Sequence, residues 1–178
     1  MKNIIIETER LWLTEFQPGE EHLIYELNED PAVTQYTGDP IRDLAHARQV
    51  LETVILPQYS LYGHGRWAVY IKDTNKFIGW CGLKTRPERD FEIDLGYRFL
   101  PAAWGKGYAT EAAAATLRYG FEKLCLQRIT GRAMPQNTGS LNVLEKIGMQ
   151  YIGEEIVDDH PAKTYIAINP LSQTGSHS

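Results

Sequence analysis

The chain has little cysteine and no long apolar run, and each of these absences excludes a class of protein. Its 178 residues include only two cysteines, too few for a disulfide scaffold and without the spacing of a zinc site. No segment approaches the run of about 18 apolar residues that a membrane-spanning helix needs, and the start lacks the apolar stretch of an export signal. We therefore expect a cytoplasmic protein that is neither exported nor membrane-bound.

An excess of basic residues is also missing. The chain carries 18 basic and 23 acidic residues, a formal net charge of -5, which argues against nucleic acid as a partner and tolerates a cationic one better. Cys81 and Cys125 stand among apolar residues and are predicted to be buried thiols in a reducing compartment. The five histidines are scattered along the sequence, so no metal site is expected.

The rest of the composition is that of an ordinary globular protein. Hydrophobic residues make up 43% and charged residues 23% of the chain, as in a protein that folds on its own. This length suits one domain, which we place at residues 1–170. The last residues, 171–178, are polar and predicted to form a mobile tail.

Apolar periodicity and turn residues predict the order β-αα-βββ-α-β-α-ββ. This order is typical of an α/β (α+β) protein with a mixed sheet, flanking helices and a parallel crossover on each side of the strand at 128–133. The predicted strands lie within 4–16, 67–71, 77–83, 91–99, 128–133, 149–157 and 163–168, and the predicted helices within 20–28, 41–56, 108–124 and 138–147.

A glycine loop precedes the predicted helix at 108–124. Gly105 and Gly107 expose backbone amides where the helix begins, and a helix N-terminus with free N–H groups binds a pyrophosphate. Lys106 adds a charge there. The alternative is that the glycines only shape a tight turn. No Walker A string occurs, and Thr110 stands where a dinucleotide fingerprint needs a third glycine or alanine, so the ordinary nucleotide folds are disfavoured.

Two carboxylates share one face of the strand that precedes this loop. Glu92 and Asp94 are two positions apart, so both side chains point the same way. Neighbouring carboxylates raise one another's pKa toward that of a useful general base. The alternative is that they form a solvated strand face.

Three motifs together resemble one known family. They are Thr8-Glu9-Arg10-Leu11-Trp12-Leu13, the run from Trp104 to Ala112, and Asn137-Thr138-Gly139-Ser140 followed by Val143 to Met149. In this order they resemble the GCN5-related N-acetyltransferases (GNAT), and within that family the RimJ/RimL-like branch of ribosomal-protein N-terminal acetyltransferases. The resemblance spans about residues 7–168.

The resemblance implies about seven mostly antiparallel strands with a splayed parallel pair and about four flanking helices. It also implies direct transfer of an acetyl group from acetyl-CoA to a primary amine, with a peptide N-terminal α-amine favoured as acceptor and a monomer or homodimer as the assembly. Two alternatives stay open: a small amine as acceptor, such as an antibiotic, polyamine or amino-acid derivative, or a catalytically weak acyl-CoA sensor. Leu144, where many relatives have a catalytic tyrosine, motivates the sensor.

The resemblance also assigns residues to the cofactor. In the family the pyrophosphate rests on the glycine loop, whose first residue is usually Arg or Gln where this chain has Trp104. The pantetheine pairs with the end of the preceding strand and contacts the asparagine that stands here at Asn137, which alternatively is only a helix cap. The cofactor-binding residues implied are Phe99, Leu100, Trp104, Gly105, Lys106, Gly107, Tyr108, Ala109, Thr110, Asn137 and Lys146.

For catalysis the resemblance points to Ser140, which in the RimJ/RimL-like branch replaces the missing tyrosine as proton donor; capping of its helix is the alternative. Asp94 is the first choice as base, acting through water, and Glu92 the second. The aromatic residues Tyr36, Tyr62 and Trp67 line either an acceptor pocket or the core. The acidic residues that either attract a cationic acceptor or form solvated helix faces are Glu20, Glu21, Glu26, Glu29 and Asp30, with Glu92 and Asp94.

Overall fold

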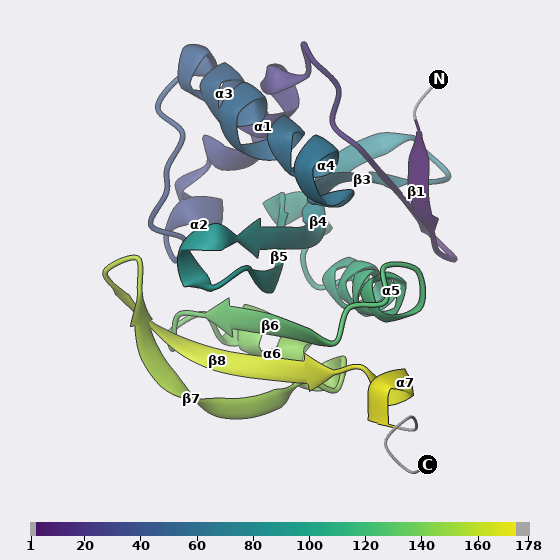
Figure 1. Cartoon of the computed structure of the whole chain (residues 1–178). Coiled ribbons are helices and arrows are strands. Elements are labelled where there is room, and N and C mark those ends of the chain that lie inside the picture. The colour runs from purple at the N-terminus through teal and green to yellow at the C-terminus, as the bar shows by residue number, and fades with distance from the viewer. Residues whose placement is uncertain (1–2, 174–178) are drawn as a thin grey trace.

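A computed structural model describes residues 3–173, which form one eight-stranded sheet with helices on both faces (Figure 1). The strand order is β1-β2-β3-β4-β5-β6-β8-β7. The strands are β1 Ile4–Glu7, β2 Leu11–Thr14, β3 Arg66–Ile71, β4 Lys76–Arg86, β5 Glu92–Phe99, β6 Arg128–Ala133, β7 Gln150–Val157 and β8 His160–Ile168. The α-helices are α1 Glu21–Asn28, α2 Pro31–Thr34, α3 Leu44–Val50, α4 Leu56–Tyr62, α5 Tyr108–Glu122, α6 Thr138–Lys146 and α7 Pro170–Gln173.

The sheet divides between β5 and β6. All other neighbours in it are antiparallel, whereas this central pair is parallel. β5 pairs with β4 along its whole length, from Glu92 to Phe99. With β6 it pairs only at Asp94↔Thr130 and Leu95↔Gly131. The predicted mixed sheet with a splayed parallel pair is confirmed, and the edge of β5 after Leu95 has no strand partner.

The two crossovers around β6 differ. The connection from β5 through α5 joins adjacent parallel strands. The connection from β6 through α6 leads to β7, which runs in the same direction as β6 because both are antiparallel to β8. β8 therefore separates the two strands of the second crossover.

Each face of the sheet has its own core. On one face, α5 and α6 pack against side chains such as Trp67, Leu83 and Leu95. On the other, the helices from α1 to α4 pack against Ala68, Tyr70 and Trp80. The helices therefore cover the two faces of the sheet, and the ends of the central strands remain available to form the site.

Three elements before α5 differ from the prediction. The segment from Ile4 to Phe16, predicted as one strand, folds into the hairpin of β1 and β2. The helix predicted to stop before Pro57 continues into α4, because a π-helical turn at Leu51–Ile55 precedes it and places the proline in the first turn, where no backbone N–H is needed. The short α2, begun by the Asp30 cap and a proline, was not predicted.

The two thiols have opposite surroundings. Cys81 is buried on β4, where burial raises the pKa of its thiol to about 12. The prediction that Cys125 is buried is wrong. This residue is exposed and has a left-handed backbone (φ 56°) in the turn after α5, which closes through a hydrogen bond from Leu126 N to Gly120 O.

The last described element is the short helix α7. α7 includes the first residues of the segment predicted to be a mobile tail, and 174–178 lie outside the described residues. Among the described residues, no helix combines the length and apolarity needed to cross a membrane. Within the same range, no group of three or more His, Cys, Asp or Glu side chains is arranged to hold a metal ion.

Candidate active site

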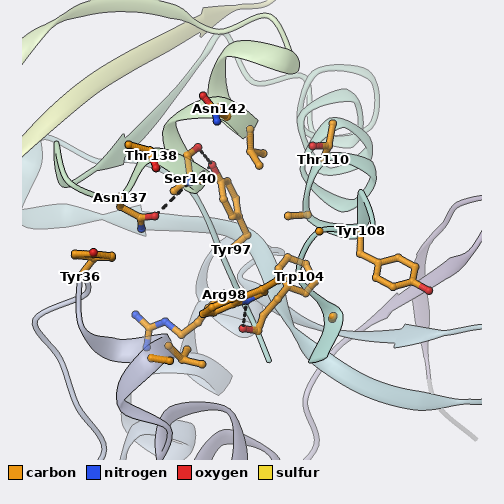
Figure 2. Close-up of a pocket in the computed structure, with 18 of the residues that line it drawn as sticks. Tyr36, Tyr97, Arg98, Trp104, Tyr108, Thr110, Asn137, Thr138, Ser140 and Asn142 are labelled. Carbon is orange, nitrogen blue, oxygen red and sulfur yellow. Dashed lines mark hydrogen bonds between the residues drawn. The ribbon is translucent and has the colours of Figure 1, made fainter. Parts of the chain in front are cut away.

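A cavity of about 590 Å³ opens where the N-terminal ends of α5 and α6 face the unpaired edge of β5. Figure 2 shows side chains from all three elements converging on it. Of the residues predicted to bind the cofactor, the cavity brings together Phe99, Trp104, Gly105, Gly107, Tyr108, Ala109, Thr110, Asn137 and Lys146. Ser140 also lines it, whereas Leu100 and Lys106 do not.

The α5 end of the cavity is built from backbone. Gly105 and Gly107 both have left-handed backbones, with φ of 74° and 81°, which glycine adopts without steric cost. Gly107 caps α5, and no side chain within residues 3–173 caps the amides of its first turn. The N–H groups of Tyr108, Ala109 and Thr110 therefore lack intrahelical acceptors and add to the positive end of the helix dipole. This arrangement suits a diphosphate.

The glycine loop is fastened to the N-terminal hairpin. The Glu111 carboxylate accepts hydrogen bonds from Thr8 Oγ1 (2.6 Å), Arg10 N (2.9 Å) and Arg10 Nε (2.7 Å). Arg10 Nη1 also donates to the carbonyl of Lys106 (3.0 Å), and its guanidinium lies over the Tyr108 ring. These contacts fix the loop and turn the Tyr108 side chain away from Ser140 (Figure 2).

The edge of β5 offers backbone groups to the cavity. Leu100 N donates to Ile78 O of β4 (2.9 Å), and because neighbouring residues of a strand point their backbone groups to opposite sides, Phe99 points its own toward the cavity. Trp104 Nε1 donates to the Phe99 carbonyl (2.8 Å). Of Phe99 and Leu100, only Phe99 presents its backbone to a ligand lying along this edge.

Two hydroxyls meet at the centre of the site, on facing elements. Ser140 Oγ on α6 donates to the Tyr97 hydroxyl on β5 (3.2 Å), and that hydroxyl donates to the Ser140 carbonyl (2.7 Å; Figure 2). Burial raises the pKa of Tyr97 above its ordinary value, so its hydroxyl stays protonated at neutral pH. Tyr97 is not among the residues predicted from the sequence, although the Gly96-Tyr97 pair just after Asp94 is a signal that could have pointed to it.

Helix capping was an alternative role for both Asn137 and Ser140, and the structure assigns it to Asn137. Its side-chain oxygen accepts from Ser140 N (3.2 Å), which caps α6. The Ser140 hydroxyl is therefore not used to cap the helix and is directed at Tyr97 instead.

Glu92 and Asp94 do not pair with one another, because each binds an arginine. Glu92 receives two hydrogen bonds from Arg132 (2.5 and 2.7 Å). Burial favours its neutral form, but the hydrogen bonds and charge of Arg132 outweigh burial and lower the pKa of Glu92. The expected rise in the pKa of Glu92 is thus wrong. Asp94 Oδ2 binds Arg66 Nη2 (3.0 Å).

A second cavity of about 300 Å³ adjoins the first and is lined in part by residues of β3 to β6. Asp94 lines it, whereas Glu92 lines neither cavity. Of the aromatic residues considered for an acceptor pocket, Tyr36 lines both cavities, but Trp67 is core and Tyr62 lines neither. The two cavities meet at Tyr36, Thr37, Tyr97, Arg98, Asn137 and Ser140.

Comparison with known proteins supplies the family. The model of the acetyltransferase (GNAT) domain matches residues 10–150. The chain belongs to the GNAT family. It is 32% identical over 148 residues to "Uncharacterized N-acetyltransferase p20" of Bacillus licheniformis, covering 82% of each chain. It is therefore an N-acetyltransferase of the GNAT type, and this fold binds acetyl-CoA.

Solved structures agree on the GNAT fold. A GNAT-family acetyltransferase from Bacillus anthracis is 27% identical, with a TM-score of 0.77 over 92% of this chain and 98% of that one. A ribosomal L7/L12 α-N-protein acetyltransferase, RimL, in complex with coenzyme A has a TM-score of 0.79 over 93% and 98% of the two chains. Its identity of 16% supports the fold alone.

Gly107→Leu tests the backbone cradle of this GNAT domain. A side chain at this left-handed position costs about 1–2 kcal/mol and covers the amides of the first turn of α5. We expect several-fold weaker binding of CoA, measured by calorimetry. Gly63→Leu is the matched control, because Gly63 has a similar φ of 76°, open space around it and no place in either cavity. Equal CoA affinity in both variants would exclude the cradle.

Glu111→Gln tests the tether between α5 and the hairpin. Burial favours the neutral acid, but the hydrogen bonds from Thr8 and Arg10 outweigh it and lower the pKa of Glu111. A lowered folded-state pKa stabilises the fold above the unfolded value of about 4.3, and this contribution is lost as the pH falls through the folded pKa.

The Glu111→Gln variant is therefore expected to lose about 1–2 kcal/mol of unfolding free energy at pH 7, and the deficit should shrink toward pH 3. Urea unfolding at the two pH values measures it. Glu122→Gln, at the exposed opposite end of α5, should have little effect at either pH. A deficit independent of pH would contradict the role of the charge.

Proposed function

We propose that this enzyme transfers the acetyl group of acetyl-CoA to the α-amine of a peptide or small molecule by direct attack of the amine on the thioester. The observation that carries the proposal is the meeting of two cavities at the Tyr97 and Ser140 hydroxyls. One cavity suits the cofactor and the other remains for the acceptor. A bound acyl donor and a bound amine would thus meet without a covalent intermediate on the protein.

Acetyl-CoA supplies an acyl group activated as a thioester. The amides of Tyr108, Ala109 and Thr110 would hold its diphosphate, and the backbone of Phe99 would pair with its pantetheine arm in the manner of an added strand. Lys146, the last residue of α6, lines the same cavity. It would bind a further phosphate of the cofactor. Asn137 is committed to its helix by the cap and contributes the surface beside Ser140.

The transfer needs one proton removed and one supplied. As the amine nitrogen bonds to the acyl carbon, it loses a proton and the carbon–sulfur bond breaks, so the departing thiolate must be protonated. Ser140, whose hydroxyl is hydrogen-bonded to that of Tyr97, is our candidate proton donor. Asp94 is our candidate base through water: only its Oδ2 has a partner among the described side chains, Arg66, and its carboxylate lines the second cavity.

The hydroxyl pair favours turnover over the sensor alternative. Leu144, at the position of the family's usual tyrosine, is 1% exposed within the core, so no group at this position reaches the cavity. Tyr97 and Ser140 provide two donors at the junction instead. A binding protein without chemistry has no need of a pair of hydroxyls at that point.

The α-amine of a peptide is the acceptor that suits a base acting through water. Its pKa is about 8, compared with about 10.4 for lysine, so a useful fraction is neutral at physiological pH. We place the enzyme, on the motifs of its sequence, in the RimJ/RimL-like branch and in the cytoplasm. The acceptor would then be a peptide N-terminus or a small α-amine.

Thiol release from acetyl-CoA tests the proposal. We expect free CoA to form in the presence of N-terminal peptides or small α-amines, with an equal amount of N-acetylated product by mass spectrometry. Calorimetric binding of CoA with no product from any amine would contradict the enzyme and favour the sensor.

Ser140→Ala separates catalysis from binding. Loss of a proton donor is expected to lower kcat about tenfold or more, with CoA affinity nearly unchanged, because the Asn137 cap uses the backbone of Ser140 and survives the substitution. Ser60→Ala is the control, since Ser60 is exposed on α4 and bonds only a local carbonyl. Equal kcat in Ser140→Ala and wild type would remove Ser140 from the mechanism.

A further inference from the structure

The second cavity is basic, although the whole chain is acidic. Its lining includes the basic residues Arg66, Lys84, Arg86, Arg98 and Arg132 but only three acidic ones, Asp39, Asp94 and Asp158. These basic residues come from four neighbouring strands, β3 to β6. The sequence suggested an acidic site that attracts a cationic acceptor. The second cavity, which we propose for the acceptor, is instead lined mainly by basic residues.

Strand register explains why the charges gather. In the antiparallel pairing of β4 with β5, Lys84 lies opposite Asp94 and Arg86 opposite Glu92, so these side chains share one face. Arg66 joins them by crossing the sheet over Gly96, where a Cβ would lie 2.4 Å from its Nη2. A side chain at position 96 would therefore displace the Arg66 guanidinium from this path.

Each of the four arginines already has a carboxylate. Arg66 binds Asp94, and Arg98 binds Asp39. Arg86 binds Glu88 and Asp158, and Arg132 binds Glu92 and Glu155. Their charges are largely compensated within the protein.

Lys84 is different, since it has no ion pair or hydrogen bond from its ammonium group within residues 3–173. Burial and the charges of Arg66 and Arg86 lower the pKa of Lys84, and the opposing effect of the Asp94 and Glu88 carboxylates is smaller. The side chain is half-buried and lines the second cavity. An anion entering the cavity would supply the missing partner.

The cavity is also walled on its far side. The loop after α2 approaches β8 so closely that a Cβ on Gly38 would lie 2.7 Å from His160 Nε2. His160 lines the cavity together with Tyr36 from that loop. Lys84, this wall and the Tyr97–Ser140 junction therefore line one and the same cavity.

We propose that the acceptor carries a carboxylate close to its reacting amine and that Lys84 binds this carboxylate. The inference rests on the proposed function, because the amine must reach the junction of the two cavities while its anionic group lies in the second one. The shared chemistry has two sources, the α-carboxylate of a free amino acid or the acidic side chain of an N-terminal residue in a peptide.

Two matched pairs of acceptors distinguish the sources. Alanine against alaninamide tests the α-carboxylate, with the rates compared at equal concentrations of neutral amine because the carboxylate raises the pKa of alanine's amine. The C-terminally amidated peptide Asp-Ala-Ala against Asn-Ala-Ala tests the side chain. In at least one pair we expect kcat/KM to be about tenfold or more higher for the carboxylate, the size of a charge-assisted hydrogen bond. The pair that shows the preference identifies the source.

Lys84→Met tests the residue, because methionine keeps much of the apolar stem and removes the charge. The carboxylate preference should fall toward one, and Lys84→Gln should behave in the same way, which guards against a folding defect in either variant. Lys76→Met, at the exposed start of the same strand, should retain the wild-type preference.

The failures are distinguishable. Equal rates for the carboxylate and amide members of both pairs, or an unchanged preference in both folded Lys84 variants, would overturn this inference and leave the acetyltransferase intact. Absence of product from every acceptor, charged or neutral, with CoA still bound would overturn the proposed function and this inference with it.

Discussion

The separation of β5 from β6 is the constraint on which the rest of the site depends. After Leu95↔Gly131 the two strands no longer pair, so β5 keeps hydrogen-bonding groups that no strand uses. Backbone polar groups away from water need a partner, and a ligand lying in the cavity can provide one. The same separation opens the sheet between its two faces and lets the cavities meet across β5 at the Tyr97 and Ser140 hydroxyls.

The elements with strong local signals could be predicted from sequence. The strand at 128–133 matches β6, and α5 begins just after the glycine loop, where free amides were expected. The elements that failed depend on distant partners. The turn between β1 and β2 is held by Glu111, 103 residues from Thr8, and such a contact leaves no trace in local periodicity. Pro57 predicts a helix end because the π-helical turn before it has no sequence signature.

In the site, too, local features could be predicted from the sequence and contacts between distant residues could not. Backbone features followed from sequence, since Gly105 and Gly107 needed only their own conformations. Side-chain pairing did not. Glu92 and Asp94 share a face as expected, but Arg132 and Arg66 decide their chemistry. The role of Tyr97 depends on its hydrogen bond with Ser140, which lies 43 residues later in the sequence.

The place of β8 in the sheet has a consequence for how the chain assembles during synthesis. The strands from β1 to β5 lie in the order in which they leave the ribosome, so each finds its neighbour already present. β6 and β7 both pair with β8, which is made last. Until residue 168 emerges, this half of the sheet has two strands with exposed edges. The nascent protein must therefore hold one finished half beside one that is open to wrong partners.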